Sequence, residues 1–483
     1  MLFNSYVFVL LFLPLCLLGY FGLNHFKKYK LAQIFLFGMS LWFYGYFNPS
    51  YLLVILCSVL LNYSTYQLMK VQKFYPYRKM IMILGVALNV GILCYFKYMD
   101  FFIGNINGLF KTEIPFLKIA LPLGISFFTF QQISFIVDAY KGEIEEYDFW
   151  DYTNFVTFFP QLIAGPIVTH DELVPQFKDL EKKKFNWDNF AEGVYIFAFG
   201  MAKKVLLADT FGDVVNYGFV TINQLTALSA LIVMLSYTIQ IYFDFSGYCD
   251  MAIGIGKMMN IDLPLNFNSP YKALTITEFW DRWHMTLTRF LTKYVYIPLG
   301  GSRKGHVRTY VNIMIVFFVS GLWHGASWNF VFWGVCHGLF MVITRMFKSF
   351  FDRLHPVFNW CMTFSFVNVL WLFFRAENFS QALTVLKALF SWNFYLDQVI
   401  VDMFRLTELK KLLSFFRVED AYPNFLITAF FLTAFVLILG CSNAYEKMKK
   451  FKPTFSRLIL SVFLLTWCVF SFAGISEFIY FNF

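Results

Sequence analysis

Two histidines of this chain have the side-chain type and the surroundings needed for proton transfer. His324 lies inside a long apolar stretch, Tyr310–Thr344, in the sequence Gly321-Leu322-Trp323-His324-Gly325. An ionisable group at membrane depth is costly enough for function to be the first hypothesis, and imidazole is a suitable general base toward an alcohol. The two glycines leave room for a substrate to approach, and Trp323 supplies an apolar wall. The alternative is a neutral imidazole that only bonds a backbone carbonyl between helices.

The second candidate, His284, ends the sequence Glu278-Phe279-Trp280-Asp281-Arg282-Trp283-His284. If this stretch is helical, Asp281 lies one turn from His284, and Glu278 one turn from Asp281 and Arg282. A structural ion-pair network and a catalytic or donor-binding role explain the pattern equally well. His337 follows His324 by thirteen residues and has either a direct role or a helix–helix hydrogen bond. The other histidines lie at predicted interfaces or in loops, where solvated histidines are common: His25, His170, His306 and His355.

Other common kinds of catalytic site have no support in the sequence. It contains no HExxH, Walker A, GxSxG or CxxC motif, and no strand-associated GxGxxG. The eight cysteines lie in or beside apolar runs without zinc spacing. We therefore expect no metal site and no bound cofactor.

The composition assigns these residues to a membrane protein. Hydrophobic residues make up 59% of the chain and charged residues 14%, against roughly a quarter charged in soluble domains. The 66 phenylalanines exclude disorder and a collagen-like fibre, and long unbroken apolar runs exclude an outer-membrane barrel. The net charge of +9 comes from short basic clusters between apolar runs, which indicates the positive-inside bias and not nucleic-acid binding.

The expected fold is therefore an all-α, polytopic helical bundle of about 10–12 spans, with hairpin or re-entrant segments. Basic clusters between the spans, taken as cytoplasmic, place both termini outside. The N-terminal apolar run has no cleavage signal and should remain as the first span. Ala376–Pro423 could hold one or two extracytoplasmic helices. The candidate spans are Ser5–His25, Leu31–Phe47, Ser50–Met69, Lys79–Met99, Pro115–Asp138, Phe190–Ala208, Thr226–Phe245, Pro356–Arg375, Phe425–Cys441 and Leu458–Phe478.

Three further stretches do not read as simple spans. Thr153–Val168 contains two prolines and a glycine, which predicts a re-entrant segment buried in protein. Tyr310–Thr344 is too long for one span and has basic residues at both ends, which predicts a hairpin with His324 at its turn. Asp244–Tyr310 mixes apolar and charged residues, so we expect short amphipathic helices packed on the cytoplasmic face.

At this point the residues resemble a known family, the membrane-bound O-acyltransferases, and within it the bacterial branch typified by alginate O-acetyltransferase. The departures are a leucine in Pro264-Leu265-Asn266, where an acidic residue is often found, and a terminal FNF in place of FQF. The stretches that carry the resemblance are spread over most of the chain: Leu121–Glu143, Phe159–Val168, Gly200–Asp209, Tyr242–Tyr271, Thr277–Gly305, Gly321–Gly338 and Phe478–Phe483.

The resemblance implies a single acyltransferase domain over residues 1–483, with a catalytic core at about 115–345 and additional C-terminal spans at about 356–478. It also implies a central tunnel, reached by His324 in the WHG element and by His284 in the RWH element. The acyl donor would enter from the cytoplasm and the acceptor from outside. Further residues expected to position the donor or substrate are Asp281, Arg282, Trp323, Asn266, Arg303, Lys304 and His337.

The resulting hypothesis is transfer of an acyl group, acetyl from acetyl-CoA, across the bacterial cytoplasmic membrane to hydroxyls of an exported or cell-envelope polysaccharide. His324 would be the general base, directly or in a relay to the serine of an extracytoplasmic SGNH-type partner that the family leads us to expect. One alternative is D-alanyl transfer to teichoic acid from a carrier-protein thioester. A transporter for an envelope precursor would instead use His324 as a proton relay, and a pure scaffold would not need it.

Overall fold

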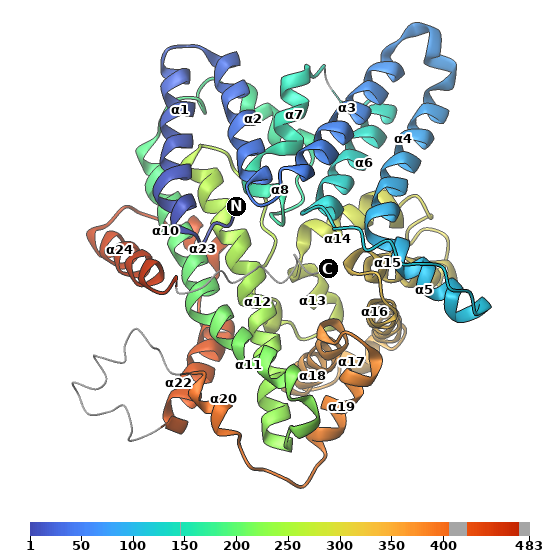
Figure 1. The fold of residues 1–483 in the computed structure, drawn as a ribbon, viewed down its shortest axis with the longest axis vertical. Helices are drawn as coiled ribbons and strands as arrows, with labels where there is room; N and C mark the ends of the chain where they lie inside the picture. The colour runs from blue at the N-terminus through green and yellow to red at the C-terminus, as the bar shows by residue number, and fades with distance from the viewer. Residues whose placement is uncertain (145, 405–422, 473–483) are drawn as a thin grey trace. The chain divides into compact units, whose positions relative to one another are not determined.

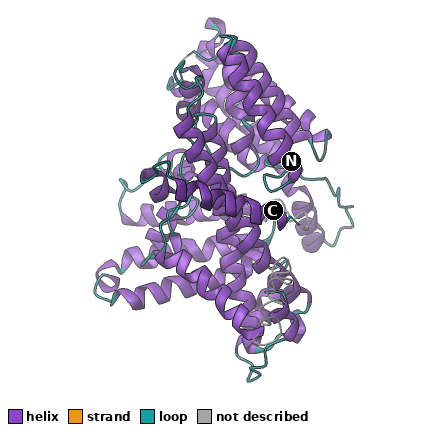
Figure 2. Cartoon of the chain, turned by 90° about the vertical axis from the view of Figure 1, so that its left-hand side faces the viewer, coloured by secondary structure: helices purple, strands orange, loops and turns teal. Residues whose placement is uncertain are grey.

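The computed structural model describes residues 1–144, 146–404 and 423–472. In this part of the chain the secondary structure is helical, with no strand (Figure 2). Seven helices or helix runs are long and apolar enough to cross a membrane, which confirms the all-α polytopic fold: Phe8–His25, Ser50–Lys70, Gln72–Phe110, Ala227–Met258, His306–His324, Trp328–Met346 and Pro356–Arg375.

The chain divides into two compact units, and the helices α10 and α12 each run through both. The first unit contains residues 1–197 and 251–265. Within it, α1 packs on α2, α2 and α3 pack on α7, and α3 and α4 pack on α6 (Figure 1). Its helices are η1 Phe8–Phe12, α1 Leu13–His25, α2 Tyr29–Gly45, α3 Ser50–Lys70, η2 Gln72–Tyr77, α4 Arg78–Leu93, η3 Cys94–Tyr98, α5 Met99–Phe110, α6 Ile125–Lys141, α7 Phe149–Thr157, α8 Phe159–Leu162, α9 His170–Lys178 and α10 Trp187–Ala202.

The second unit contains residues 198–250 and, of the described residues, those from 266 onward. Its central feature is the antiparallel pair α15 and α16, against which α13 and α18 pack. Its helices are η4 Lys203–Ala208, α11 Asp209–Val220, η5 Ile222–Gln224, α12 Ala227–Met258, η6 Pro270–Lys272, α13 Ile276–Arg282, α14 Met285–Leu291, η7 Thr292–Tyr296, α15 His306–His324, α16 Trp328–Met346, α17 Lys348–Phe351, α18 Pro356–Arg375, α19 Phe379–Leu389, α20 Gln398–Asp402, α22 Pro423–Phe435, η9 Val436–Gly440, α23 Ala444–Lys449 and α24 Phe455–Phe470.

Most predicted spans coincide with helices, but several boundaries differ. The span predicted to end at Met99 continues as α5 to Phe110, and in the span predicted to end at Phe478 helix α24 ends at Phe470. The predicted span Pro115–Asp138 begins too early, because residues 111–124 form no helix and α6 starts at Ile125. The span predicted to end at Phe245 continues as α12 to Met258. Two aspartates of α12 form ion pairs with lysines of η4. Lys204 Nζ lies 2.7 Å from an Asp244 oxygen, and Lys203 Nζ lies 2.6 Å from an Asp250 oxygen. Paired charges of this kind allow a helix to continue where hydropathy alone predicts its end.

The two unusual apolar stretches have the predicted form. Thr153–Val168 is broken into α7, α8 and a non-helical end, and all its residues are buried in protein. Tyr310–Thr344 forms the hairpin of α15 and α16, which turns at residues 325–327. In the region after Arg375, α19 and α20 are the expected short helices, whereas residues 405–422 and the expected terminal motif at 478–483 lie outside the described residues.

His170 was predicted to be solvated, and this prediction is wrong. It begins α9, and its ring is buried between Asp138 of α6 and Tyr147. His170 Nε2 lies 3.4 Å from Asp138 Oδ2, and its Nδ1 lies 3.1 Å from the Tyr147 hydroxyl oxygen. Because all three side chains are buried, this polar cluster links α6 to α9 inside the first unit.

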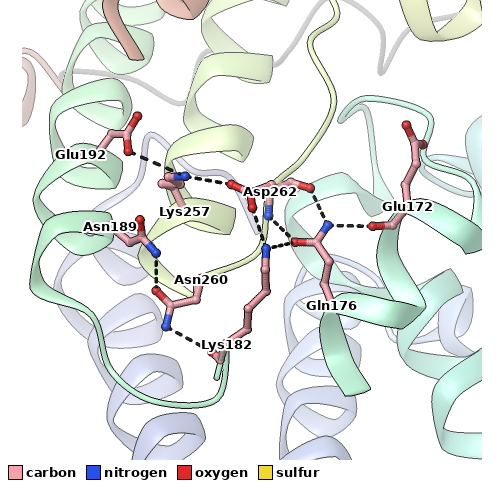
Figure 3. A network of polar contacts seen from close by, with 8 residues as sticks. All are labelled: Glu172, Gln176, Lys182, Asn189, Glu192, Lys257, Asn260 and Asp262. Carbon is pink, nitrogen blue, oxygen red and sulfur yellow. Dashed lines mark hydrogen bonds and ion pairs between the residues drawn. The ribbon is translucent and has the colours of Figure 1, made fainter. Parts of the chain in front are cut away.

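A second polar network of the first unit holds the segment that follows α12 (Figure 3). Lys182 Nζ and Lys257 Nζ lie 2.6 and 2.8 Å from the two carboxylate oxygens of Asp262. Gln176 Oε1 accepts the Asp262 backbone N–H at 2.8 Å, and the Asn260 side chain donates to the backbone of Lys182. Burial raises the pKa of the Asp262 carboxyl, but the two lysines outweigh this effect and hold the pKa below its usual range.

Candidate active site

His324 is the last residue of α15 and lies at the turn of the hairpin, as predicted. Its side chain is buried, and three aromatic rings surround the imidazole. The ring centroids of Trp323, Trp333 and Phe374 lie 4.9, 5.1 and 5.1 Å from that of His324. The imidazole therefore sits in an apolar aromatic cage within the second unit.

The glycines beside His324 serve helix packing, and not substrate approach as predicted. A Cβ added to Gly321 would lie 2.4 Å from the backbone oxygen of Phe330 in α16, so α15 and α16 meet closely at this point. A Cβ on Gly325 would lie 2.0 Å from the Phe330 ring. Protein atoms already occupy the space beside both glycines, which fixes the backbone that carries His324.

His284 lies between two helices, and not on one helix with Asp281 as the sequence suggested. α13 ends at Arg282, and His284 takes a left-handed backbone conformation, φ 47° and ψ 50°, immediately before α14. Its partner is Asn266: His284 Nδ1 and Asn266 Oδ1 are 3.0 Å apart. Asn266 Oδ1 also accepts from the backbone N–H and the hydroxyl of Thr286.

The environment of His284 keeps its imidazole neutral. The ring is fully buried, and burial lowers the pKa of His284 to about 3. Asn266 Oδ1 must be an acceptor because it receives the Thr286 backbone N–H, so His284 Nδ1 carries the proton and donates to it. The lone pair of the neutral ring is then at Nε2.

His337 is buried in the middle of α16 and has a partner of the opposite kind. The Trp280 indole Nε1–H donates to His337 Nδ1 at 3.3 Å. An indole N–H can only donate, so Nδ1 carries the lone pair and the proton of the neutral ring is at Nε2. Trp280 belongs to α13, so this bond also ties α13 to α16.

Two tryptophans connect the three histidines. Trp323 lies 5.8 Å from His284 and 4.9 Å from His324, measured between ring centroids. Trp333 lies 5.1 Å from His324 and 4.7 Å from His337. The series His284–Trp323–His324–Trp333–His337, hereafter the histidine–tryptophan series, gathers residues from α13–α14, α15 and α16 into one site.

A cavity of about 1010 Å³ lies beside this series within the second unit. Its apolar end includes Trp280 and Phe317, and both rings contact that of His337. Its polar residues include Arg345 and Lys348, which carry positive charge. The lining also contains Asp281 and Asp352, so its formal charges balance, and Arg345 and Lys348 are the lining groups suited to pair with an anion.

The remaining predicted residues are distributed unevenly around this cavity. Asp281 lines it, and burial together with the Glu278 carboxylate raises the pKa of Asp281. Arg282 does not line it but pairs with Glu278 at 2.7 Å. Arg303 and Lys304 are exposed and lie outside the lining, whereas two other exposed basic residues, Arg345 and Lys348, belong to it. In the sequence, Arg345 and Lys348 follow the apolar stretch Tyr310–Thr344.

No group of three His, Cys, Asp or Glu side chains suited to a metal ion occurs among residues 1–144, 146–404 and 423–472. Polar groups of the site instead bond one another. Asn266 Nδ2 donates to the Cys249 sulfur at 3.3 Å, which extends the His284 cluster to α12.

Comparison with known proteins identifies the family. The sequence profile of the membrane-bound O-acyltransferase family matches residues 118–380. A peptidoglycan O-acetyltransferase of Helicobacter pylori is 40% identical over 100% of this chain and 98% of its own length. The chain belongs to the membrane-bound O-acyltransferase family. It is therefore an acyltransferase.

Two further relatives of this acyltransferase differ in how much of it they match. A probable alginate O-acetylase of Pseudomonas putida is 38% identical over 88% of this chain and 89% of its own length. A teichoic acid D-alanyltransferase of Streptococcus thermophilus is 26% identical over 46% of this chain and 56% of its own length. The profile match includes the whole histidine–tryptophan series and the residues that line the cavity.

Proposed function

We propose that this acyltransferase moves an acetyl group from a cytoplasmic thioester, acetyl-CoA, across the bacterial cytoplasmic membrane to hydroxyls of an exported or cell-envelope polysaccharide. Peptidoglycan is the first acceptor to test, because the peptidoglycan O-acetyltransferase relative matches the full length of this chain. The acetyl donor is preferred over D-alanyl because the O-acetylating relatives match more of the chain at higher identity than the D-alanyltransferase does.

The observation that carries the proposal is the grouping of three buried histidines, one of which, His337, contacts two residues that line the cavity. Arg345 and Lys348 belong to the basic flank of the hairpin, which the positive-inside bias assigns to the cytoplasm. Their charges suit the phosphates of CoA, and Trp280 and Phe317 suit the uncharged thioester end. His324 lies at the other end of α15, toward the outer side, where an acceptor would arrive. The same bias places both chain termini outside.

His324 is the proposed general base. It takes the proton from the acceptor hydroxyl, whose oxygen forms a bond to the thioester carbonyl carbon. The tetrahedral intermediate then breaks its carbon–sulfur bond, the acetyl group stays on the acceptor oxygen, and the thiolate leaves and takes up the proton. The acceptor is either the sugar hydroxyl or a serine of an extracytoplasmic SGNH-type partner that transfers the group onward. His284, held by Asn266, positions the donor.

The test uses the purified full chain in lipid nanodiscs with acetyl-CoA labelled in the acetyl group. Peptidoglycan fragments are supplied as acceptor, with and without an SGNH-type esterase domain. We expect His324→Ala to lower acetyl transfer by about 10²–10⁴-fold, the usual contribution of a general base. His25→Ala is the matched control, because His25 is exposed at the end of α1.

Each possible result of this assay decides for or against one alternative. Turnover that survives His324→Ala would remove the base role from this residue. Transfer from a D-alanyl carrier-protein thioester, with no use of acetyl-CoA, would establish the D-alanyl alternative. A rate that rises only with the esterase domain would place the serine relay before the sugar.

A further inference from the structure

Two buried N–H groups on one face of α16 have no acceptor in the part of the chain that the structure describes. Trp333 and His337 are one helical turn apart, both are fully buried, and their ring centroids are 4.7 Å apart. Trp333 Nε1 and His337 Nε2 each make no hydrogen bond there. The indole nitrogen can only donate a hydrogen bond, so Trp333 contributes one unsatisfied donor.

His337 contributes the second donor because Trp280 fixes its tautomer. The Trp280 N–H occupies Nδ1, which must therefore hold the lone pair. The proton of the neutral ring is then at Nε2, the atom that makes no bond. Trp280 is thus a positioning residue for His337, since it keeps the second N–H directed away from α13.

The neighbours that the structure describes around the two donors are aromatic rings. His337 contacts the rings of Trp280, Phe317 and Phe366, and Trp333 contacts those of Trp371 and Phe374. Buried donors in native proteins nearly always meet an acceptor, so an unsatisfied pair indicates an oxygen supplied by water or by a ligand.

The cavity comes close to this pair without including it, since neither Trp333 nor His337 is among its lining residues. Trp280 and Phe317 line it, and so does Met341, one turn beyond His337 on α16. On the other side of the pair, the His324 ring lies 5.1 Å from that of Trp333. The two donors therefore lie between the cavity proposed for the thioester and the proposed base.

We propose that the Trp333 and His337 N–H groups bind the carbonyl oxygen of the acyl group. This inference rests on the proposed acyl transfer. When the acceptor oxygen bonds to the carbonyl carbon, the carbonyl π electrons move onto that oxygen, and the two N–H groups stabilise its negative charge. When the carbon–sulfur bond breaks, the electrons return to restore the carbonyl. Preorganised donors of this kind act most strongly in a buried site, and both Trp333 and His337 are fully buried.

The test uses p-nitrophenyl acetate, an acetyl ester that presents the same carbonyl oxygen and needs neither CoA nor a carrier protein. The full chain in nanodiscs is assayed for nitrophenolate release as wild type and as Trp333→Phe, which removes the N–H and keeps an aromatic ring. We expect kcat to fall by about 10²–10³-fold, the usual effect of removing one oxyanion donor, with KM unchanged.

Two comparisons separate this effect from a packing defect. Trp371→Phe is the matched control: Trp371 is equally buried and stacks 6.0 Å from Trp333, but its N–H donates to the Tyr271 hydroxyl. It should lower the unfolding temperature and keep the wild-type kcat. His337→Gln can place an N–H near the position of Nε2, so it should retain far more activity than His337→Phe.

Wild-type kcat in Trp333→Phe would overturn the inference and assign the two donors to a structural water. Loss of nitrophenolate release equal in Trp333→Phe and Trp371→Phe would also overturn it. A third outcome is that the wild type cleaves p-nitrophenyl acetate, Trp333→Phe cleaves it more slowly, and acetyl-CoA is the one substrate that is not used. This outcome would disprove acetyl-CoA as the donor and would still support the oxyanion site. If wild type and His324→Ala release nitrophenolate at the same rate, both the oxyanion inference and the proposed acyl transfer by His324 are contradicted.

Discussion

His284 and His337 are both fully buried, yet their partners fix opposite tautomers. Asn266 offers His284 an acceptor oxygen, so the proton lies at Nδ1 and the lone pair at Nε2. Trp280 offers His337 a donor N–H, so the lone pair lies at Nδ1 and the proton at Nε2. Two chemically identical side chains thus present a base at one end of the histidine–tryptophan series and an acid hydrogen at the other.

The difference shows how one site can give different roles to chemically identical side chains. Burial removes water as a competing partner, so a single neighbouring group decides which nitrogen is protonated. His324 lies between the two, separated from each by one tryptophan ring. The three imidazoles are therefore suited to different tasks although the sequence presents three similar residues.

The largest effect is expected from removing the acceptor of the His284 tautomer. Asn266→Leu removes the oxygen that accepts the His284 Nδ1–H and the Thr286 N–H in a buried site. Each orphaned donor costs about 1–3 kcal/mol, so the free energy of unfolding should fall by at least about 2 kcal/mol. Thermal unfolding in nanodiscs measures this loss, and acetyl turnover by the folded fraction should fall with it.

Asn312→Leu is the control for this comparison. Asn312 is as buried as Asn266, but its side chain donates to the backbone oxygen of Gly301, away from the histidines. It should destabilise the chain to a similar degree and leave the turnover of the folded fraction intact. Equal losses of turnover in both variants would mean that Asn266 has a structural role only.

A second effect, which depends on pH, isolates His284. The pKa of His284 is about 3 in the folded chain, against 6.5 when the ring is exposed. Above pH 6.5 the ring is neutral in both states and burial has no ionisation cost. As the pH falls from 6.5 toward 3, only the unfolded chain binds the proton, so stability should decrease by up to about 1.4 kcal/mol per pH unit.

His284→Asn should remove this part of the acid sensitivity. Asn keeps an N–H near the position of Nδ1 and tolerates the left-handed backbone that His284 adopts. The unfolding temperature is measured between pH 7.5 and pH 4.5 for both chains, and the variant should show the shallower decline. Parallel curves would mean that the imidazole takes up its proton over the same pH range in the folded and the unfolded chain.

The sequence predicted the elements better than their pairings. The length of Tyr310–Thr344 and its basic flanks predict a hairpin, and the structure has His324 at its turn. Proline and glycine in Thr153–Val168 likewise predict its broken, buried form. Both predictions need only the residues of one chain segment and the known thickness of a bilayer.

The contacts that define the site join residues far apart in the chain. The bond of Asn266 to His284 depends on a left-handed residue that no local pattern predicts, and the bond of Trp280 to His337 joins α13 to α16. The extension of α12 depends on lysines of η4 that neutralise Asp244 and Asp250. Such pairings follow from tertiary packing, which hydropathy along one sequence does not report.

The smallest effect is expected from replacing Trp280, the hydrogen-bond partner of His337. Trp280→Phe removes the N–H that holds Nδ1 but keeps an aromatic ring against Trp333 and Phe317. Loss of one hydrogen bond should lower the free energy of unfolding by about 1 kcal/mol. The two neutral tautomers of His337 then become similar in energy, so a part of the molecules loses the Nε2 proton.

If that proton serves the acyl oxygen, kcat should fall only a few-fold, in proportion to the lost tautomer, and far less than in Trp333→Phe. Nitrogen NMR of histidine-labelled protein can check the cause directly, since protonated and unprotonated ring nitrogens resonate far apart. Trp280→Phe should move the His337 signals toward a mixture and leave those of His284 unchanged. Unchanged His337 signals would mean that the fold, and not Trp280, selects its tautomer, and the contrast between the two histidines would then need another origin.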